Sequence, residues 1–441
     1  MKKLLIVGGG HATAALLNQL HKQTSNGCFD WQVTVISAES TEAVNRPLLS
    51  KDYLSHKVGD DQLPLIASEV RQAMTSTLGL QWLTDCRVIS VDRQRHQLQL
   101  YNGCKLEWDT LVLATGVRLR QLSLPGGDQP VSEMKGVFYL KTASQSQALR
   151  QALQHARQLT VIGGGFIGLE VAATARQQGV AVRVLESGER LLRRVVAAPV
   201  SHWFQQMHIE QGVELRLNSS LQHLLADDHG NVRAIQLASG DVLATDLVVV
   251  GVGVEPETGL AQSAGLACDN GILVNEQCQT SDPNIFAAGD GANRRHPLYQ
   301  QRLRLESVEN ATHQGQLIAA MLTQSPLPPT AVPWFWSTQY DARLQIAGLS
   351  QGYDQLITRQ AEGKPGISWL YLRQGRLLAC DAVNRPADFL QAKKLISSGQ
   401  SLDPLQAANA AIPLGQCVAP VDPNDPNAGN SRTLATAAVA S

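Results

Sequence analysis

The sequence predicts an α/β protein made of two Rossmann-like, dinucleotide-binding domains and a small α+β domain at the C-terminal end. Three observations predict this fold. A glycine-rich loop follows an apolar run at residues 8–13, and a second loop of the same kind follows another apolar run at residues 163–168. Beyond the prolines of residues 326–333, short runs typical of β-strands replace the earlier pattern.

Length and composition are those of an ordinary globular protein. The 441 residues allow about three domains, and a net charge of −1 gives no field that favours nucleic acid or a membrane surface. No apolar run approaches the roughly 18 residues that a membrane span needs. The seven cysteines are widely spaced and form no CxxC pair, so we expect free thiols, no metal or iron–sulfur site, and a cytoplasmic location.

Each glycine-rich loop lies inside a strand–helix–strand pattern. In the first, a strand at residues 4–7 is followed by a helix from about 13 to 23 and a strand at 31–36. The same order of elements occupies residues 159–185. One such unit binds one dinucleotide, so two units indicate a protein that passes electrons between two of them.

Two similar apolar runs, at residues 110–116 and 247–253, predict how the domains are connected. We interpret them as the crossings into and out of an inserted domain. The last residues are mainly Pro, Asp, Asn, Ala and Ser, which offer little to bury. The sequence therefore predicts a first domain of residues 1–118 and 245–324, an inserted domain of 119–244, a C-terminal domain of 325–415 and a disordered tail of 416–441.

The glycines of the two loops have specific tasks. The first glycine of each loop makes the tight turn, and the second leaves space for a pyrophosphate. The helix that follows presents free N–H groups to the phosphates. The expected cofactor-binding residues of the two loops are Gly8, Gly10, His11, Ala12, Gly163, Gly165, Phe166, Ile167 and Gly168.

The first loop departs from the pattern at its third glycine, where Thr13 stands. That glycine normally allows the helix to pack closely on the strand. We therefore expect Thr13 to loosen the fit slightly without removing the phosphate site. His11 either touches the bound cofactor or has a structural role in the loop.

Acidic residues follow the second strand of each unit. Glu186 stands where a carboxylate can accept hydrogen bonds from a ribose 2′-hydroxyl and repel a 2′-phosphate, which favours NADH over NADPH. Arg190, Arg193 and Arg194 follow it and could still admit a 2′-phosphate. Glu39 is the nearest carboxylate in the first unit and is the weaker candidate for a ribose ligand.

A third motif occupies residues 280–290 and ends in Gly289 and Asp290. We expect it to place an acid at a strand end beside a helix start. The expected role of Asp290 is to bind the ribityl chain of a flavin, and the alternative is a helix N-cap.

Together with the stretches 45–51, 111–116, 163–170, 305–311 and 332–337, these motifs resemble the FAD-dependent pyridine-nucleotide oxidoreductases of the glutathione-reductase fold. Within them the chain is most similar to the ferredoxin reductase subgroup, which includes putidaredoxin reductase, rubredoxin reductase and the reductase components of Rieske dioxygenases. The resemblance covers about residues 1–415, and Leu48 replaces the second proline of the subgroup's Arg-Pro-Pro-Leu-Ser-Lys. It implies FAD in the first domain and NADH in the inserted one.

The resemblance also implies roles for single residues. Lys51 should lie near flavin N5 and pair with Glu170, and Trp336 should be the aromatic residue nearest the flavin, ahead of Trp334. These three, Lys51, Glu170 and Trp336, are the expected catalytic residues. The alternatives are a surface lysine that begins a helix and tryptophans that pack in the core. The remaining residues expected along the cofactors are Arg46, Pro47, Ala114, Thr115, Gly116 and Gly253.

The disulfide reductases of this fold carry a CxxxxC pair after the first unit, whereas residues 43–53 contain no cysteine. Electrons should therefore leave the flavin directly. The expected acceptor is a small acidic iron–sulfur protein, a [2Fe–2S] ferredoxin or a rubredoxin, that serves a cytochrome P450 or a ring-hydroxylating dioxygenase. The protein itself should be a monomer or a weak dimer.

A docking surface for the acceptor is expected from Arg294, Arg295, Arg302 and Arg304, unless these form a solvated loop or pair internally with Glu306.

Two other functions stay open on the sequence. One is an NADH oxidase that produces hydrogen peroxide. The other is a flavoprotein like apoptosis-inducing factor, which acts partly by binding.

Overall fold

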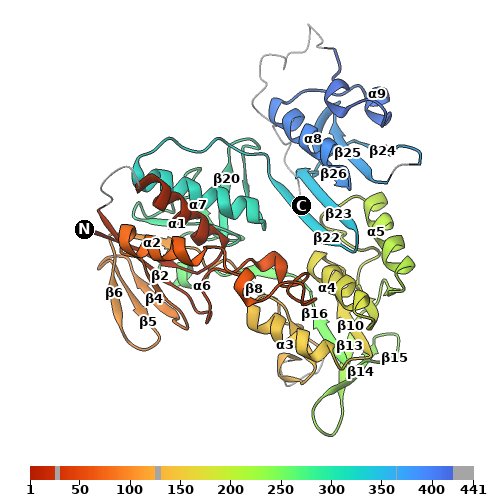
Figure 1. Ribbon diagram of the computed structural model, residues 1–441, viewed down its shortest axis with the longest axis horizontal. Coiled ribbons are helices and arrows are strands. Elements are labelled where there is room, and N and C mark those ends of the chain that lie inside the picture. Colours follow the sequence, from red (N-terminus) through yellow and green to blue (C-terminus); the bar gives the residue numbers. More distant parts are fainter. Residues whose placement is uncertain (25–29, 125–130, 364, 421–441) are drawn as a thin grey trace.

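The computed structural model describes residues 1–24, 30–124, 131–363 and 365–420. The chain forms three lobes (Figure 1). Two are built on parallel sheets and the third on an antiparallel sheet, so the predicted fold class is confirmed. None of the helices in these ranges is long and apolar enough to span a bilayer.

The first lobe is built on a five-stranded parallel sheet with the strand order β19-β7-β1-β2-β3. Its strands are β1 (Lys2–Val7), β2 (Trp31–Ile36), β3 (Gln81–Leu83), β7 (Thr110–Leu113) and β19 (Ile285–Ala287). An antiparallel sheet of three further strands belongs to the same lobe, with β4 (Val88–Asp92), β5 (Gln97–Leu100) and β6 (Lys105–Glu107). The lobe's longer helices are α1 (His11–Thr24), α2 (Ser68–Leu78) and α7 (Val308–Thr323). Its remaining elements are the turns η1 (Arg46–Leu48) and η2 (Asp60–Gln62), α6 (Gly259–Ser263), β18 (Ile272–Val274), β20 (Ala292–His296) and β21 (Gln301–Leu303).

The second lobe repeats this architecture, with the strand order β12-β11-β10-β16-β9 in its parallel sheet. The strands are β9 (Val137–Tyr139), β10 (Gln158–Ile162), β11 (Ala181–Leu185), β12 (Glu214–Arg216) and β16 (Leu247–Val250). The other elements are η3 (Val131–Glu133), α3 (Ala143–Leu153), α4 (Phe166–Gln177), α5 (Ala198–Glu210) and an antiparallel sheet of β13 (Leu221–Ala226), β14 (Val232–Leu237) and β15 (Val242–Ala244).

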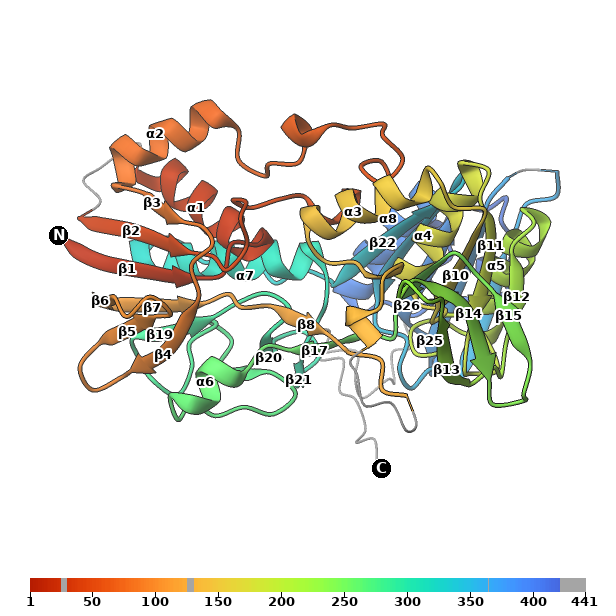
Figure 2. The same cartoon turned by 90° about the horizontal axis from the view of Figure 1, so that it is seen from below.

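The position of β16 corrects the predicted boundary at residue 245. This strand pairs with β10 inside the second sheet, just as β7 pairs with β1 in the first. The two apolar runs are similar because they occupy equivalent places in two repeated domains, and so they do not mark the crossings. The chain crosses through the antiparallel pair of β8 (Val117–Leu119) and β17 (Val254–Pro256), which lie side by side between the lobes (Figure 2).

The third lobe is an antiparallel sheet with the order β22-β23-β26-β25-β24. Its elements are β22 (Trp334–Gln339), β23 (Ala342–Gly348), β24 (Gln355–Arg359), β25 (Ile367–Arg373), β26 (Arg376–Val383), α8 (Pro386–Ser398), α9 (Pro404–Ala408) and η4 (Leu414–Gln416). The predicted tail began too early, because Cys417 is buried and Val418 bridges to Leu402. Residues 421–441, also predicted to be disordered, lie outside the described ranges.

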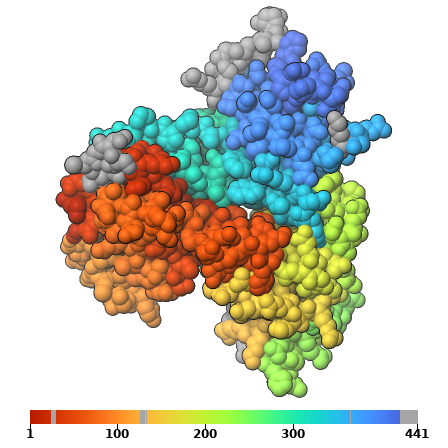
Figure 3. Space-filling model, in the orientation of Figure 1, coloured from red at the N-terminus to blue at the C-terminus, as the bar shows by residue number. Residues whose placement is uncertain are grey.

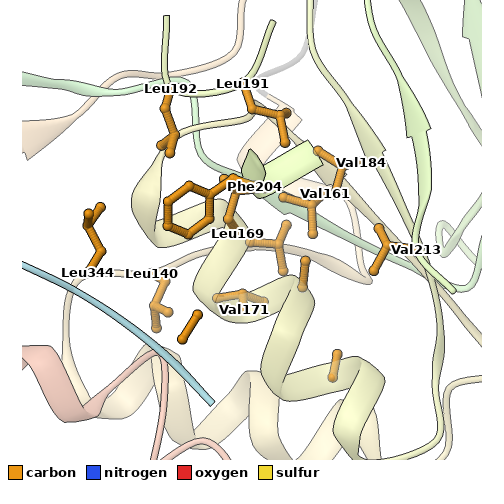
Figure 4. Packing of buried hydrophobic residues seen from close by; sticks show 14 of the residues in the cluster. Leu140, Val161, Leu169, Val171, Val184, Leu191, Leu192, Phe204, Val213 and Leu344 are labelled. Atoms are coloured by element: carbon orange, nitrogen blue, oxygen red, sulfur yellow. The ribbon is translucent and has the colours of Figure 1, made fainter. Parts of the chain in front are cut away.

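One hydrophobic cluster joins the three lobes. It contains Leu49 and Leu54 from the first lobe, Leu169 and Phe204 from the second, and Leu344 from the third. Figure 4 shows the part of this cluster around α4. The segment of residues 45–60, orange-red in Figure 3, lies against the second lobe. This packing places the segment at the junction where the expected site residues meet.

Candidate functional site

The first glycine loop connects β1 to α1 and has the geometry of a phosphate cradle. Gly8 has a φ of +111°, and a Cβ atom at this position would lie 2.1 Å from the carbonyl oxygen of Ala114. Only glycine fits there. A Cβ atom at Gly10 would have nothing within 4 Å, so open space remains above the start of the helix.

The helix is fixed to the first loop by a side chain. Thr13 is buried, and its hydroxyl donates a hydrogen bond of 2.6 Å to the carbonyl of Gly8. The equivalent Gly168 of the second loop has no side chain, and a Cβ there would lie 2.5 Å from the carbonyl oxygen of Gly163. Thr13 therefore replaces the close glycine contact by a hydrogen bond. We expected Thr13 to loosen the packing of the helix on the strand, and the sequence did not predict this bond.

The second glycine loop has the same features between β10 and α4. A Cβ atom at Gly163 (φ +104°) would lie 2.4 Å from the carbonyl oxygen of Gly251, whereas one at Gly165 would have nothing within 4 Å. Phe166 begins α4, and Ile167 is 47% exposed at the rim of the loop. Each loop thus has one tightly enclosed glycine and one open one.

Glu186 ends the strand beside this loop and holds the loop with both carboxylate oxygens. Oε2 accepts the N–H of Gly164 and Oε1 accepts the N–H of Gly188, each at 2.7 Å. Arg193 is exposed next to it, with its Nε 3.4 Å from the Cβ position of Gly188. Arg190 is engaged elsewhere, because its guanidinium donates to the hydroxyl of Ser201 and to the backbone carbonyls of Val196 and Arg193.

The structure brings Glu39 and Arg46 together. Arg46 Nη2 lies 2.6 Å from Glu39 Oε1, and Arg46 Nη1 donates to the carbonyl oxygen of Lys141 at 2.7 Å. Pro47 lies in the short turn η1 directly after Arg46. The Glu39 carboxylate is therefore already paired in this structure, and its role as a ribose ligand stays a prediction.

Asp290 follows β19, and the next element in the chain is the strand β20, so it is not a helix N-cap. It does lie beside a helix start, because a Cβ at Gly289 would be 3.5 Å from the Cβ of Ala12 in α1. The N–H of Gly289 is held by Gln314 Oε1 at 2.8 Å. Burial and the nearby Glu306 raise the pKa of Asp290 to about 7.

The loop after β7 lies against the segment that contains Asp290. A Cβ at Gly291 would lie 2.7 Å from the carbonyl oxygen of Gly116, so this loop and the Asp290 segment are in contact. Thr115 donates its hydroxyl to the carbonyl of Glu257 at 2.7 Å. Gly253, in the crossing back to the first lobe, lies near Arg194, whose Nη2 is 3.6 Å from its Cβ position.

The residues around the first loop fit FAD. Among the described residues, the buried His11 Nε2 has no hydrogen-bond partner. Burial together with Arg46 lowers the pKa of His11 to about 4, so its ring is neutral. A buried polar atom normally has a partner. The open space at Gly10 and the half-buried Asp290 border the same region. A dinucleotide would supply the partner that His11 Nε2 lacks and would fill the open space at Gly10.

The predicted pair of Lys51 and Glu170 is formed. Lys51 Nζ lies 2.7 Å from Glu170 Oε2, and the carboxylate belongs to a residue that is only 2% exposed. Ser50 also donates to Oε2, at 2.5 Å, and Ser337 donates to Oε1, at 2.7 Å. The carboxylate is therefore surrounded by donors from all three lobes, as a buried charge requires.

Trp336 lies on β22, where residues alternate between two sides of the strand. Ser337 faces Glu170, and Phe335 on the same side packs against Phe166, with ring centroids 4.7 Å apart. Trp336 faces the other way, 5.4 Å from the ring of Trp334. Both tryptophans are half-buried. The position of Trp336 next to a flavin remains a prediction.

The prediction that four arginines form one docking surface is wrong for the group as a whole. Arg294 is 3% exposed and donates to the carbonyl of Glu276 inside the lobe. Arg304 pairs with Glu306 at 2.6 Å, the internal pairing that the sequence left open. Arg295 and Arg302 remain exposed.

Sequence reasoning missed several residues that build the site. Gly315 lets α7 approach α1, since a Cβ there would lie 2.4 Å from the carbonyl oxygen of Ala12. Gln314 and Ser50 were missed because they act through single hydrogen bonds across long sequence separations. Ser337 could have been found, because it ends one of the motifs and alternates with Trp336.

Comparison with known proteins agrees with this geometry. Residues 2–315 match the family described as "Pyridine nucleotide-disulphide oxidoreductase", and residues 334–418 match "Reductase C-terminal". The chain is 40% identical to putidaredoxin reductase of Pseudomonas putida over 374 residues, which cover 85% of this chain and 87% of the relative. It is 35% identical to the ferredoxin–NAD(+) reductase component of the anthranilate 1,2-dioxygenase system of Burkholderia cepacia, covering 93% and 98% of the two chains.

A solved structure extends the match to three dimensions. The reductase in the covalent putidaredoxin reductase–putidaredoxin complex superposes with a TM-score of 0.88 at 36% identity, covering 94% of this chain and 98% of that one. The resemblance predicted from the motifs is confirmed. The chain belongs to the pyridine nucleotide-disulphide oxidoreductase family and carries that family's reductase C-terminal domain.

Proposed function

We propose that this protein is an NADH-dependent, FAD-containing reductase that passes electrons singly to a small acidic iron–sulfur protein. The acceptor would be a [2Fe–2S] ferredoxin or a rubredoxin that serves a cytochrome P450 or a ring-hydroxylating dioxygenase. The observation that carries this proposal is the pair of Lys51 and the buried Glu170, because Lys51 belongs to the segment where disulfide reductases carry a cysteine pair.

The cysteines support a direct exit of electrons from the flavin. Residues 43–53 contain none, and all six cysteines in the described part of the chain are free. Cys278, Cys380 and Cys417 are buried, and burial raises the pKa of the Cys278 thiol to about 11. A protonated, buried thiol is a poor redox relay.

The relatives support the kind of acceptor. One of them is a reductase crystallised with putidaredoxin, and another is the ferredoxin–NAD(+) reductase component of a dioxygenase system. Each matches this chain over more than nine-tenths of both lengths. Similarity along the whole chain makes a shared reaction the simplest assignment.

The first lobe would hold FAD and the second NADH. Gly8, Gly10 and the start of α1 would hold the FAD pyrophosphate, and Asp290 would bind its ribityl chain. Gly163 and Gly165 would take the NADH pyrophosphate, with Glu186 beside the ribose. FAD, when bound, supplies the chemistry of accepting a hydride and releasing electrons one at a time.

Lys51 would act by electrostatics. Glu170 is buried and Lys51 is half-buried, and the carboxylate holds the Lys51 ammonium in one place and balances its charge. Lys51 thereby presents a fixed positive charge, which would stabilise negative charge that develops beside it. Trp336 and Phe166 would exclude water from the reacting faces.

Steady-state kinetics test this function. The purified, FAD-loaded protein is mixed with NADH, and oxygen uptake is measured before and after putidaredoxin and cytochrome c are added. Slow oxygen uptake and fast reduction of cytochrome c only with putidaredoxin are expected. Rapid oxygen uptake with NADH alone would identify an oxidase, and very slow flavin reduction with a lasting charge-transfer band and dimerisation would identify a binding protein.

A further inference from the structure

A chain of three hydrogen bonds continues beyond the Glu170 carboxylate into the protein. Ser337 Oγ lies 2.7 Å from Glu170 Oε1, and Gln339 Nε2 lies 3.2 Å from Ser337 Oγ. His208 Nε2 in turn lies 2.8 Å from Gln339 Oε1. The chain thus runs from α4 through β22 to α5.

The chemistry of these groups gives every bond in the chain the same direction. A carboxylate accepts only, so Ser337 donates its hydroxyl hydrogen to Glu170. The serine oxygen then accepts from the Gln339 amide N–H, and the amide oxygen accepts from His208 Nε2–H. Three donors in series therefore point toward one negative charge.

His208 is suited to be the neutral end of this chain. Burial lowers the pKa of His208, so the ring carries one hydrogen, and the bond to Gln339 requires that hydrogen on Nε2. Its Nδ1 atom is buried without a partner, and the ring packs edge-on against Tyr340 with centroids 5.4 Å apart. Within the described part of the molecule, the hydrogen bond of this ring is the one to Gln339.

All members of the chain are out of water. Glu170 is 2% exposed, Ser337 and Gln339 are each 1% exposed, and His208 is fully buried. Hydrogen bonds are stronger at low local dielectric, and bonds in series polarise one another. An unpaired buried polar group is costly, so removing one donor of the series would leave the next group without its partner.

This series of hydrogen bonds also connects different lobes. Ser337 and Gln339 are two positions apart on β22 and so lie on the same side of that strand. Glu170 and His208 belong to the second lobe, and Lys51 to the first. A second bond, from Thr174 of α4 to the carbonyl of Ser50 at 2.9 Å, fixes the Lys51 segment to the same helix.

From this geometry we infer that Ser337 and Gln339 are positioning residues for hydride transfer: they donate toward the Glu170 carboxylate and keep it aligned, and through it they hold the Lys51 ammonium. This inference rests on the proposed function. It gives the C-terminal domain a defined part in the first half-reaction, in addition to any contact with the electron acceptor.

The test compares Ser337→Ala with two other serine variants. Ser337→Thr keeps the hydroxyl, so it should rescue the bond. Ser368→Ala is the matched control, because Ser368 is also buried in the third lobe and also donates to a carboxylate, that of Asp388 at 2.9 Å, away from Glu170. All variants are prepared with FAD, and their spectra and Tm values are compared first.

Two readouts follow. Stopped-flow measurement of flavin reduction by NADH across pH should show Ser337→Ala about tenfold slower near neutral pH, with its acid limb moved to higher pH by about one unit. Infrared titration without NADH follows the protonated-carboxyl band that Glu170→Gln removes. This band should appear at higher pH in Ser337→Ala than in the wild type, Ser337→Thr or Ser368→Ala.

An unchanged pH profile and an unchanged carboxyl band in Ser337→Ala would overturn the inference, whatever its rate. Equal changes in Ser368→Ala would do the same, because they would show general loosening of the lobe. If Ser337→Ala does not take up FAD, Gln339→Leu removes the next donor and should move both readouts in the same direction by less. If NADH does not reduce the flavin of the wild-type protein, the proposed function is contradicted. The infrared titration needs no NADH, so it still decides whether the hydrogen bonds from Ser337 and Gln339 act on Glu170.

Discussion

Lys51 and Glu170 are 119 positions apart in the sequence and belong to different lobes, yet their Nζ and Oε2 atoms lie 2.7 Å apart. The pair joins the first two lobes, and Ser337 of β22 donates to the other oxygen of the same carboxylate from the third. Its geometry therefore reports on the assembly of the whole molecule and on the site at once.

Replacing Lys51 by Met should slow flavin reduction by roughly 10- to 100-fold, because the fixed positive charge is lost while the apolar stem is kept. Glu170 would retain its hydrogen bonds from Ser50 and Ser337, so the fold should survive. Stopped-flow absorbance with NADH measures the rate. Lys57→Met is the control, because Lys57 is 65% exposed and its pair with Asp52 is long, at 4.0 Å. A wild-type rate in Lys51→Met would remove Lys51 from the mechanism.

Replacing Glu186 by Arg should shift nucleotide preference toward NADPH. The change removes the ribose acceptor and the repulsion of a 2′-phosphate, and it adds a cation beside Arg193. It also removes two hydrogen bonds to the loop backbone, so Tm should fall as well. The ratio of kcat/KM for NADH and NADPH is the measurement. Glu189→Arg makes the same charge change at an exposed neighbour and should leave the ratio near that of the wild type; an equal shift there would indicate a general charge effect.

Gly315→Ala should weaken FAD binding and lower stability by about 3 kcal/mol. The added Cβ would meet the carbonyl oxygen of Ala12 at 2.4 Å and the backbone N of Leu16 at 2.8 Å, so α7 must move away from the start of α1. FAD titration and thermal unfolding measure both effects. Gly259→Ala is the matched control in another helix, since its Cβ would have only an ordinary contact at 3.5 Å. Tight FAD binding in Gly315→Ala would show that the contact between the helices does not shape the cradle.

The free energy of unfolding of Asp381→Asn, relative to that of the wild type, should increase as the pH rises. Burial raises the pKa of Asp381 to about 7, whereas it is about 3.9 in an unfolded chain, so the folded state binds the extra proton between these values. The stability that this proton gives is present at low pH and is lost as the pH rises through 7.

Asparagine has no such proton. The stability of Asp381→Asn relative to the wild type should therefore increase by about 2 kcal/mol from pH 5 to pH 8, or roughly 4–8 °C in Tm. Thermal unfolding at several pH values measures the difference, with Asp341→Asn as an exposed control in the same lobe. A constant difference across this range would mean that Asp381 stays ionised in the fold.

Local features of the fold were predictable from the sequence. The motif of each glycine loop is local in sequence, and Gly8 and Gly163 are indeed enclosed, by the residues that follow β7 and β16. The boundary at residue 245 was wrong because β16 and β7 have equivalent places in repeated sheets, and similar sequences do not reveal which sheet a strand joins.

Features that depend on long-range geometry were less accessible. Charge in the sequence suggested that Arg294 faces an acceptor, but the alternation of β20 turns its side chain inward and leaves Arg295 outside. The hydroxyl of Ser337 reaches a carboxylate 167 positions away, and no local pattern encodes that bond. The pair of Lys51 and Glu170 was expected only through resemblance to a family.

The absorbance of the purified protein tests the central claim most directly. The FAD-loaded protein is mixed anaerobically with one equivalent of NADH and then with an oxidised, acidic iron–sulfur protein such as putidaredoxin. The account predicts that NADH bleaches the flavin band and that the iron–sulfur protein restores it without oxygen. A preparation that takes up no FAD, or a bound flavin that neither NADH nor NADPH bleaches, would contradict it.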